Sequence, residues 1–307
     1  QESPRVKEFE RRFAQMEGGG YALATGTGMG AIKLVSDTLV GKERTIVYSR
    51  NIFGTTVNLF EKHYPQLGFR TIPVDLVNLD MWEQRIKEYR PSAVFLETPS
   101  NPKTELGDIA EIAKIARRYD AKLVVDSTFS SPVYQHPLEL GADVVIHSTT
   151  KYIDGFGTTL GGVVVTNDSA IREALFATRR ITGSIQKEID ALVCIDGLRT
   201  LEERMNAISD NALQIAKTLE HREVSTIYLG LPSHPQYQLG QIQHRGNGGI
   251  VAFDLGTREN ALNFIQQSQV PIVANLGLHY SSLSHPATTT HSRMSPEDRQ
   301  KAGVTDG

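Results

Sequence analysis

The chain has almost no cysteine, no long apolar run and little charge imbalance. A single cysteine, Cys194, cannot form an internal disulfide, which excludes a secreted disulfide scaffold. The 32 Lys and Arg residues face 35 Asp and Glu residues, whereas binders of nucleic acid or anionic membranes carry a basic excess. No membrane-length apolar run and no signal peptide is visible. We therefore expect a cytoplasmic protein without nucleic-acid or membrane partners.

Two common catalytic arrangements are also missing. The nine histidines are scattered, no Cys-x-x-Cys pair exists, and His285 and His291 have no third ligand nearby. We therefore expect no metal site. The sequence Gly-x-Ser-x-Gly is absent as well, which argues against a Ser-His-Asp hydrolase of the α/β type.

The sequence does contain strand-like patterns that alternate with helix-like patterns. Its 307 residues, 39% hydrophobic and 22% charged, suit one large or two ordinary globular domains. Short apolar runs alternate with helical patterns, which predicts an α/β fold with a mainly parallel sheet and helices on both faces. The strands that we expect are 21–24, 45–49, 93–97, 122–126, 143–147 and 162–166.

The helical signals then change along the chain. Asp108, with Glu111 three residues later, is typical of a helix N-cap, and apolar residues follow it at helical spacing. Residues 169–222 are mostly helical in pattern, including 191–204, and a strand at 249–254 and a helix at 258–267 come after them. We therefore expect a large domain over 1–195 and a smaller C-terminal α+β domain over 196–307.

A glycine-rich turn lies where a ligand is expected, because open parallel sheets bind ligands beyond the carboxyl ends of their strands. Residues 25–30 read TGTGMG, and they suit an anion at a helix N-terminus. Gly26, Gly28 and Ala31 also satisfy the dinucleotide pattern G-x-G-x-x-A, with Arg50 after the next strand. A plain tight turn is a third interpretation, and the motif alone does not choose between them.

Polar residues end two further strands. Asp126 ends a buried strand, where a carboxylate is costly unless it meets a cation or donors, although it could also cap a turn. Lys151 follows the next strand, with Ser148 and Thr150 before it. Two hydroxyls and a lysine suit a phosphate and an amine that forms Schiff bases with carbonyls. The alternative is a polar loop with a solvated lysine.

Asn101 stands in the sequence ETPSNP, residues 97–102, between two prolines. Prolines restrict the backbone, so this loop could aim Asn101 at a ligand, or it could be a structural turn. His147 by itself is better interpreted as a packed, hydrogen-bonded residue than as a base.

Together these residues resemble the pyridoxal-phosphate (PLP) core of the Cys/Met-metabolism enzymes. That family includes cystathionine synthases and lyases, methionine γ-lyase and O-acylhomoserine sulfhydrylases. The stretch 124–162, VVDSTFSSPVYQHPLELGADVVIHSTTKYIDGFGTTLGG, is highly specific for it, and GLRTL, GLPSHP and SHPATTTHS extend the likeness over nearly the whole chain. Within the family, 52–62 and 285–299 most resemble O-succinylhomoserine sulfhydrylases.

The resemblance implies a fold type I PLP enzyme whose large domain, 1–195, binds the cofactor. Lys151 would be the catalytic residue and would hold PLP covalently. Asp126 would pair with the ring nitrogen and keep the ring an electron sink. Phe53 stands where the family usually has a stacking tyrosine, and it lacks the phenol for acid–base work. The implied contacts to cofactor or substrate are Gly28, Met29, Phe53, Asn101, Asp126, Thr128, Ser148, Thr150, Lys151 and, for the substrate, Asn275.

The resemblance also implies a homotetramer, built as a dimer of active dimers. An N-terminal arm of the family sends a Tyr and an Arg into the neighbouring subunit's phosphate site, and a later segment carries the arginine for the substrate carboxylate. We expect both segments to lie outside these 307 residues. At 187–190 the sequence KEID replaces a usual SPFN, so the rim of the site is expected to differ.

The implied activity is γ-replacement on O-succinyl- or O-acetylhomoserine with sulfide or a thiol, forming homocysteine for methionine biosynthesis and transsulfuration. A γ-lyase that releases 2-oxobutanoate and ammonia is the alternative. An NADP-dependent oxidoreductase and a non-catalytic binding module are more remote ones. A succinyl ester would need a cation for its extra carboxylate, and the candidates are Arg50, Arg179, Arg180 and Arg293.

Overall fold

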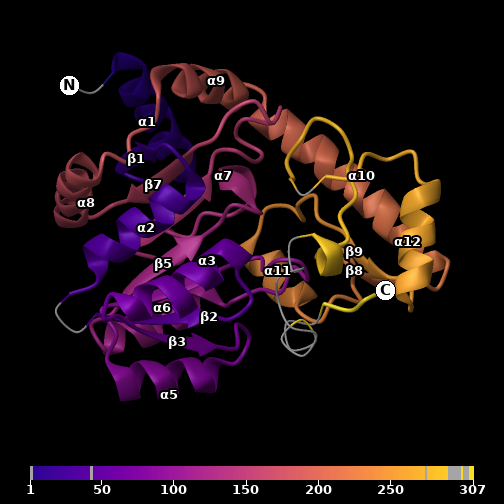
Figure 1. The fold of residues 1–307 in the computed structure, drawn as a ribbon, viewed down its shortest axis with the longest axis horizontal. Helices are drawn as coiled ribbons and strands as arrows, with labels where there is room; N and C mark the ends of the chain where they lie inside the picture. The colour runs from indigo at the N-terminus through magenta and orange to yellow at the C-terminus, as the bar shows by residue number, and fades with distance from the viewer. Residues whose placement is uncertain (1–2, 42–43, 274, 290–298, 300–303) are drawn as a thin grey trace.

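A seven-stranded sheet organises the larger part of the protein (Figure 1). The structure, a computed structural model, describes residues 3–41, 44–273, 275–289, 299 and 304–307. Neighbouring strands are parallel, except that β7 runs antiparallel to both β1 and β6, so the predicted α/β fold is confirmed. The strand order is β1-β7-β6-β5-β4-β2-β3, with β1 (Tyr21–Thr25), β2 (Thr45–Ser49), β3 (Arg70–Val74), β4 (Ala93–Glu97), β5 (Lys122–Asp126), β6 (Val144–Ser148) and β7 (Gly162–Thr166).

Helices cover both faces of this sheet. Successive strand residues point to opposite faces, so Val94 and Leu96 of β4 join one hydrophobic cluster while Phe95 joins the other. The first cluster includes α1 (Pro4–Glu17), α5 (Leu79–Tyr89), α6 (Ile109–Arg118) and α9 (Glu188–Leu198). The second includes α2 (Gly28–Leu39), η1 (Leu59–His63), α4 (Tyr64–Gln66) and α8 (Ser169–Thr182). The remaining short helices here are α3 (Gly54–Asn58) and α7 (Ser131–Tyr134).

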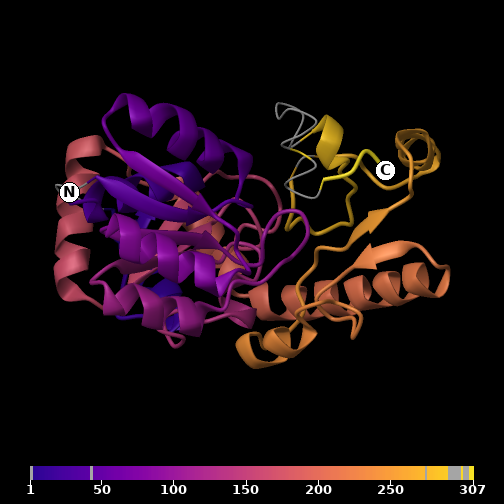
Figure 2. The ribbon, with the colours of Figure 1, turned by 90° about the horizontal axis from the view of Figure 1, so that it is seen from below.

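The C-terminal part is built on one long helix. Figure 2 shows α10 (Leu201–His221) extending from the sheet and lying beside a two-stranded sheet of β8 (Ser225–Ile227) and β9 (Ala252–Asp254). A third hydrophobic cluster, with Ala212 and Tyr228 at its centre, joins this helix to the loops around it. Also present are α11 (Tyr237–Gln243), α12 (Arg258–Gln267) and η2 (Pro286–Thr288).

The division into domains at residue 195 remains a proposal. Residue 195 lies within α9, and its side chain belongs to the larger cluster, as does Met205 in α10. The third cluster begins at Ala212. The first hydrophobic cluster, which packs against the large sheet, therefore extends into the first turns of α10.

Most of the expected elements are confirmed, and the differences have local causes. The Asp108 cap is confirmed, because its Oδ1 accepts a hydrogen bond from Glu111 N at 3.0 Å. Strand β3 was not expected, since it is an edge strand that contains Pro73. The helical pattern expected over 191–204 is divided between α9 and α10, with a break at residues 199–200. The strand expected at 249–254 is shorter in the structure, where β9 covers Ala252–Asp254.

Candidate active site

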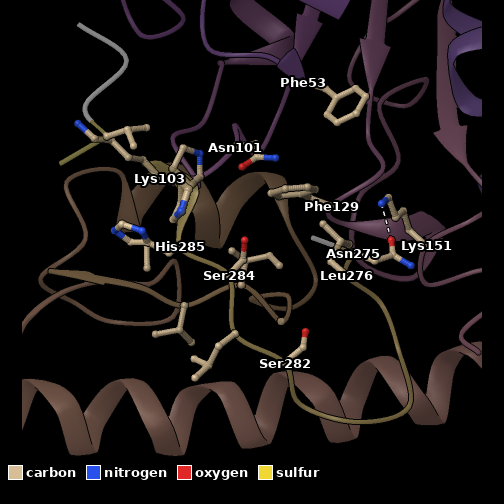
Figure 3. Close-up of a pocket in the computed structure, with 18 of the residues that line it drawn as sticks. Phe53, Asn101, Lys103, Phe129, Lys151, Asn275, Leu276, Ser282, Ser284 and His285 are labelled. Carbon is tan, nitrogen blue, oxygen red and sulfur yellow. Dashed lines mark hydrogen bonds between the residues drawn. The ribbon is translucent and has the colours of Figure 1, made fainter. Parts of the chain in front are cut away.

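A cavity of about 660 Å³ opens where β4, β5 and β6 end and α2 begins. Its walls come from the large sheet on one side and from residues 225–286 and 304–307 on the other. Figure 3 shows Lys151 beside Asn275, with Asn101 and Phe129 drawn between Lys151 and Lys103. All ten site residues expected from the sequence line this one cavity: Gly28, Met29, Phe53, Asn101, Asp126, Thr128, Ser148, Thr150, Lys151 and Asn275. Their individual roles stay predictions.

Lys151 follows β6 in a short turn and places an amine in the cavity. Its Nζ donates a hydrogen bond to Asn275 Oδ1 at 2.5 Å, which joins the sheet to the C-terminal part. Burial lowers the pKa of Lys151, because a charged ammonium loses hydration there. A larger share of the side chain is therefore the neutral, nucleophilic amine than in a solvated lysine.

Asp126 ends β5 and is fixed by its neighbours. Its Oδ1 accepts hydrogen bonds from Thr128 N at 3.0 Å and Thr128 Oγ1 at 2.6 Å, and Thr128 Oγ1 in turn accepts one from Ser148 N at 2.9 Å. Burial raises the pKa of Asp126, and the Thr128 hydrogen bonds oppose that shift. Within the described part of the chain, Oδ2 has no hydrogen-bond partner. The carboxyl group thus has one oxygen to offer a ligand.

A second buried carboxyl group lies beside it. Glu97 ends β4 and is the register partner of Asp126. Its Oε2 accepts a hydrogen bond from Phe53 N at 2.7 Å. Burial, and next the negative charge of Asp126, raise the pKa of Glu97 well above its usual range. Two adjacent buried carboxyl groups do not both ionise readily, so we infer that Glu97 is the one of the pair that favours its protonated form.

The N-terminus of α2 lines the cavity and has the features of an anion site. The N-cap Thr27 accepts a hydrogen bond from Gly30 N at 2.9 Å, while the first-turn N–H groups of Gly28 and Met29 have no intrahelical acceptor. A Cβ at Gly28 would meet Ser148 Oγ at 2.9 Å, and one at Gly162 would meet Thr27 O at 2.6 Å. Glycine therefore lets the helix end approach the β6 hydroxyl closely, an arrangement that suits phosphate.

These residues fit pyridoxal phosphate. The helix N-terminus with Ser148 suits its phosphate, the open oxygen of Asp126 suits its ring nitrogen, and the Lys151 amine suits its aldehyde. Phe53, 40% exposed, presents an aromatic ring at the cavity wall but no hydroxyl group. No group of three or more His, Cys, Asp or Glu side chains in the described ranges is arranged to hold a metal ion.

The arginines considered for a second carboxylate lie elsewhere. Arg50 and Arg180 do not line the cavity, and Arg179 is buried, with its Nη1 2.6 Å from Glu10 Oε1. Arg293 lies outside the described residues. His147 is packed as expected, with its Nε2 2.8 Å from Glu17 Oε2.

Some cavity residues are not predicted by the sequence. Of these, Glu97 and Lys103 bear on the chemistry of the site, and both lie in or next to the ETPSNP segment. Further lining residues such as Phe129 and Asp254 were not expected either. Glu97 could have been found by the same signal as Asp126, because both are acidic residues at the end of an apolar run. Lys103 has no such signal, because a lysine after a turn is usually solvated.

Comparisons with known proteins identify the family of this chain. The sequence profile of the family described as "Cys/Met metabolism PLP-dependent enzyme" matches residues 1–307. O-succinylhomoserine sulfhydrylase of Pseudomonas aeruginosa is 42% identical over 99% of this chain and 76% of its own length. L-methionine gamma-lyase of Pseudomonas putida is 35% identical over 99% of this chain and 78% of its own.

A solved structure shows the same fold. Cystathionine gamma synthase from Xanthomonas oryzae pv. oryzae, in complex with aminoacrylate and cysteine, superposes with a TM-score of 0.96 at 33% identity, over 99% of this chain and 80% of that one. The NADP-dependent oxidoreductase interpretation is therefore set aside, because the family is PLP-dependent. The chain belongs to the Cys/Met metabolism family of PLP-dependent enzymes.

Proposed function

We propose that this enzyme carries out γ-replacement on O-succinyl- or O-acetylhomoserine. Sulfide or a thiol takes the place of the acyloxy group, so that sulfide yields homocysteine and releases succinate or acetate. The observation that carries the proposal is the single cavity that joins the Lys151 amine, the Asp126 carboxyl group and the α2 N-terminus. The 42% identity to O-succinylhomoserine sulfhydrylase of Pseudomonas aeruginosa favours this reaction within the family.

The chain's own residues would bind the cofactor at its phosphate, its aldehyde carbon and its ring. The N–H groups of Gly28 and Met29 and the hydroxyls of Ser148 and Thr150 would bind its phosphate. Lys151 would hold its aldehyde carbon covalently until the substrate amine takes the place of Lys151 and frees the lysine amine. When bound, PLP supplies an electron sink for the charge left by loss of the α-proton. The remaining contacts that we propose are Asp126 to the ring nitrogen, Thr128 to Asp126, Asn101 to the phenolic oxygen and Phe53 against the ring face.

Lys151 is the base that we propose for the α-proton of the substrate. Burial favours its neutral form, and Asn275 holds its Nζ through the 2.5 Å hydrogen bond. Phe53 has no proton to give, so Lys151 also moves protons that a tyrosine would otherwise carry. Asn275 is then released to contact the substrate when Nζ moves.

A γ-lyase reaction is the second candidate. It would use the same side chains, and the 35% identity to L-methionine gamma-lyase of Pseudomonas putida favours it over any other alternative. In that case the γ-substituent would leave, as a thiol where the substrate is methionine, and protonation and hydrolysis, rather than sulfide, would complete the reaction and release 2-oxobutanoate and ammonia.

One set of assays separates the two reactions. Purified enzyme is given O-succinylhomoserine, O-acetylhomoserine or methionine, each with and without sulfide. We expect homocysteine from at least one ester only when sulfide is present. Rapid release of 2-oxobutanoate from methionine, with no homocysteine from either ester, would establish the γ-lyase and overturn the replacement reaction.

We also propose that the enzyme is a cytoplasmic homotetramer. No helix in the described part of the chain is long and apolar enough to span a membrane. Four apolar side chains around the junction of α8 and α9 are exposed, which on a soluble enzyme marks a protein contact. They are Ile181 at 86%, Ile185 at 46%, Ile189 at 63% and Leu192 at 39%.

A further inference from the structure

The cavity contains a second lysine that the proposed chemistry does not use. Lys103 lines the wall two residues after Asn101. In Figure 3 it lies on the side away from Lys151, beyond Asn101 and Phe129. A group that binds Lys103 while its α-amino end is at Lys151 must therefore reach across the cavity.

The backbone at Lys103 is held in a tight turn. Ser100 N donates a hydrogen bond to Glu105 O and Thr104 N donates one to Ser100 O, both at 2.9 Å. Glu105 N adds a bond to Ser100 Oγ at 3.1 Å, and Thr104 has a φ of 55°, in the left-handed region. The turn thus fixes the point from which the Lys103 side chain starts, next to the expected cofactor contact Asn101.

Among the described basic side chains that line the cavity, Lys103 is the one without a hydrogen-bond or ion-pair partner. The described basic residues lining the cavity are Lys103, Lys151 and His285. Lys151 is bonded to Asn275, and His285 uses both ring nitrogens, Nδ1 with Thr288 Oγ1 at 3.0 Å and Nε2 with Asp306 O at 3.3 Å.

The acidic residues of the wall do not neutralise Lys103. Glu97 and Asp126 end β4 and β5, and Asp254 ends β9, where its Oδ1 accepts a hydrogen bond from Gly256 N. Across the described ranges, none of the three forms an ion pair with Lys103. Its ammonium group is therefore available to an anionic ligand.

We propose that Lys103 binds the distal carboxylate of O-succinylhomoserine and selects the succinyl ester over the acetyl ester. This proposal rests on the proposed function, because the two esters differ by that carboxylate at the far end of the acyl group. A carboxylate that enters a largely apolar cavity needs a cation, since charge-assisted hydrogen bonds replace its lost hydration. Lys103 supplies that cation without touching the reacting carbon atoms.

The test is Lys103→Met, which keeps the length of the side chain and removes its charge. We expect KM for O-succinylhomoserine to rise about 10- to 100-fold, the range for losing a hydrogen bond to a charged group, with kcat and the constants for O-acetylhomoserine unchanged. Lys103→Arg should retain the preference for the succinyl ester, because the charge remains. Lys217→Met, an exposed lysine of α10, is the matched control and should change neither ester.

Calorimetry without sulfide separates this proposal from the proposed function. We expect Lys103→Met to weaken the Kd of O-succinylhomoserine and leave that of O-acetylhomoserine unchanged. Equal losses for both esters, or wild-type constants in Lys103→Met, would overturn the role of Lys103 even if turnover is normal. A Lys103-dependent Kd in an enzyme that makes no homocysteine would support Lys103 and overturn the replacement reaction.

Discussion

At the scale of single residues, the cavity holds two carboxyl groups at the ends of adjacent strands. Glu97 and Asp126 are both buried, and burial raises both pKa values. A positively charged ring nitrogen opposite Asp126 would favour its ionised form. Glu97 then keeps the proton, and its Oε2 still accepts the hydrogen bond from Phe53 N.

The first prediction concerns Asp126. We expect Asp126→Ala to lose far more cofactor affinity and turnover than Asp126→Glu, because removing one partner of a buried ion pair costs about 3–5 kcal/mol. Titration of the cofactor-free protein with PLP, followed by absorbance, measures the Kd. Asp196→Ala, at an exposed position, is the control. Near-normal PLP affinity in Asp126→Ala would show that another group balances the ring charge.

The second prediction concerns Glu97. A carboxyl group whose pKa is raised by folding favours the folded state while protonated, and this contribution is lost as pH rises above its usual value of 4.5. Glu97→Gln mimics the protonated form. We expect the cofactor-free variant to exceed the wild type in stability at pH 8, by about 1.4 kcal/mol for each pH unit by which folding raises the pKa of Glu97, and to equal it at pH 4. Urea unfolding measures both, and a pH-independent difference would contradict the protonated state.

The sequence alone predicts those site residues that stand next to a recognisable local pattern, such as the end of an apolar strand or the start of a helix. Asp126 and Lys151 follow apolar strands, and the glycines at 26–30 precede a helix, so all are visible in the printed chain. Lys103 and the Lys151–Asn275 hydrogen bond are not, because they depend on how the C-terminal part packs over the sheet. Contacts between residues more than 100 positions apart leave no local pattern.

At the scale of elements, we propose that the start of α2 contacts the phosphate of PLP. Gly28→Ala would place a Cβ 2.9 Å from Ser148 Oγ. We expect such overpacking to cost about 1–3 kcal/mol and to weaken PLP binding accordingly. The PLP titration described above is the measurement. Gly20→Ala, whose Cβ would meet Asn167 Oδ1 at an ordinary 3.5 Å, should bind PLP as the wild type does, and equal affinity in Gly28→Ala would contradict the close approach.

Elements with strong apolar patterns were predicted within a residue or so, and the weak ones were missed. The central strands are buried on both faces and read as continuous apolar runs. Edge strand β3, with Pro73, and the three-residue β8 carry too few apolar residues to be recognised. The break between α9 and α10 was missed because apolar spacing continues across residues 199–200.

At the scale of the whole molecule, the exposed apolar side chains at the junction of α8 and α9 predict subunit contact. We expect Ile189→Asp to shift the enzyme to a smaller species in sedimentation and to reduce turnover, because a charge would enter the proposed interface. Ile242→Asp, which changes an isoleucine that is 80% exposed on α11, is the control. An unchanged sedimentation coefficient for Ile189→Asp would place the interface elsewhere.

Borohydride reduction followed by peptide mass spectrometry tests the central claim most directly. The claim is that Lys151, and not the second cavity lysine Lys103, carries the cofactor, because burial lowers the pKa of its amine and it lies beside the phosphate-binding end. We predict a yellow protein that reductant bleaches, with the pyridoxyl mass on the peptide containing Lys151. A colourless protein, or modification at Lys103 with Lys151 unmodified, would contradict the account.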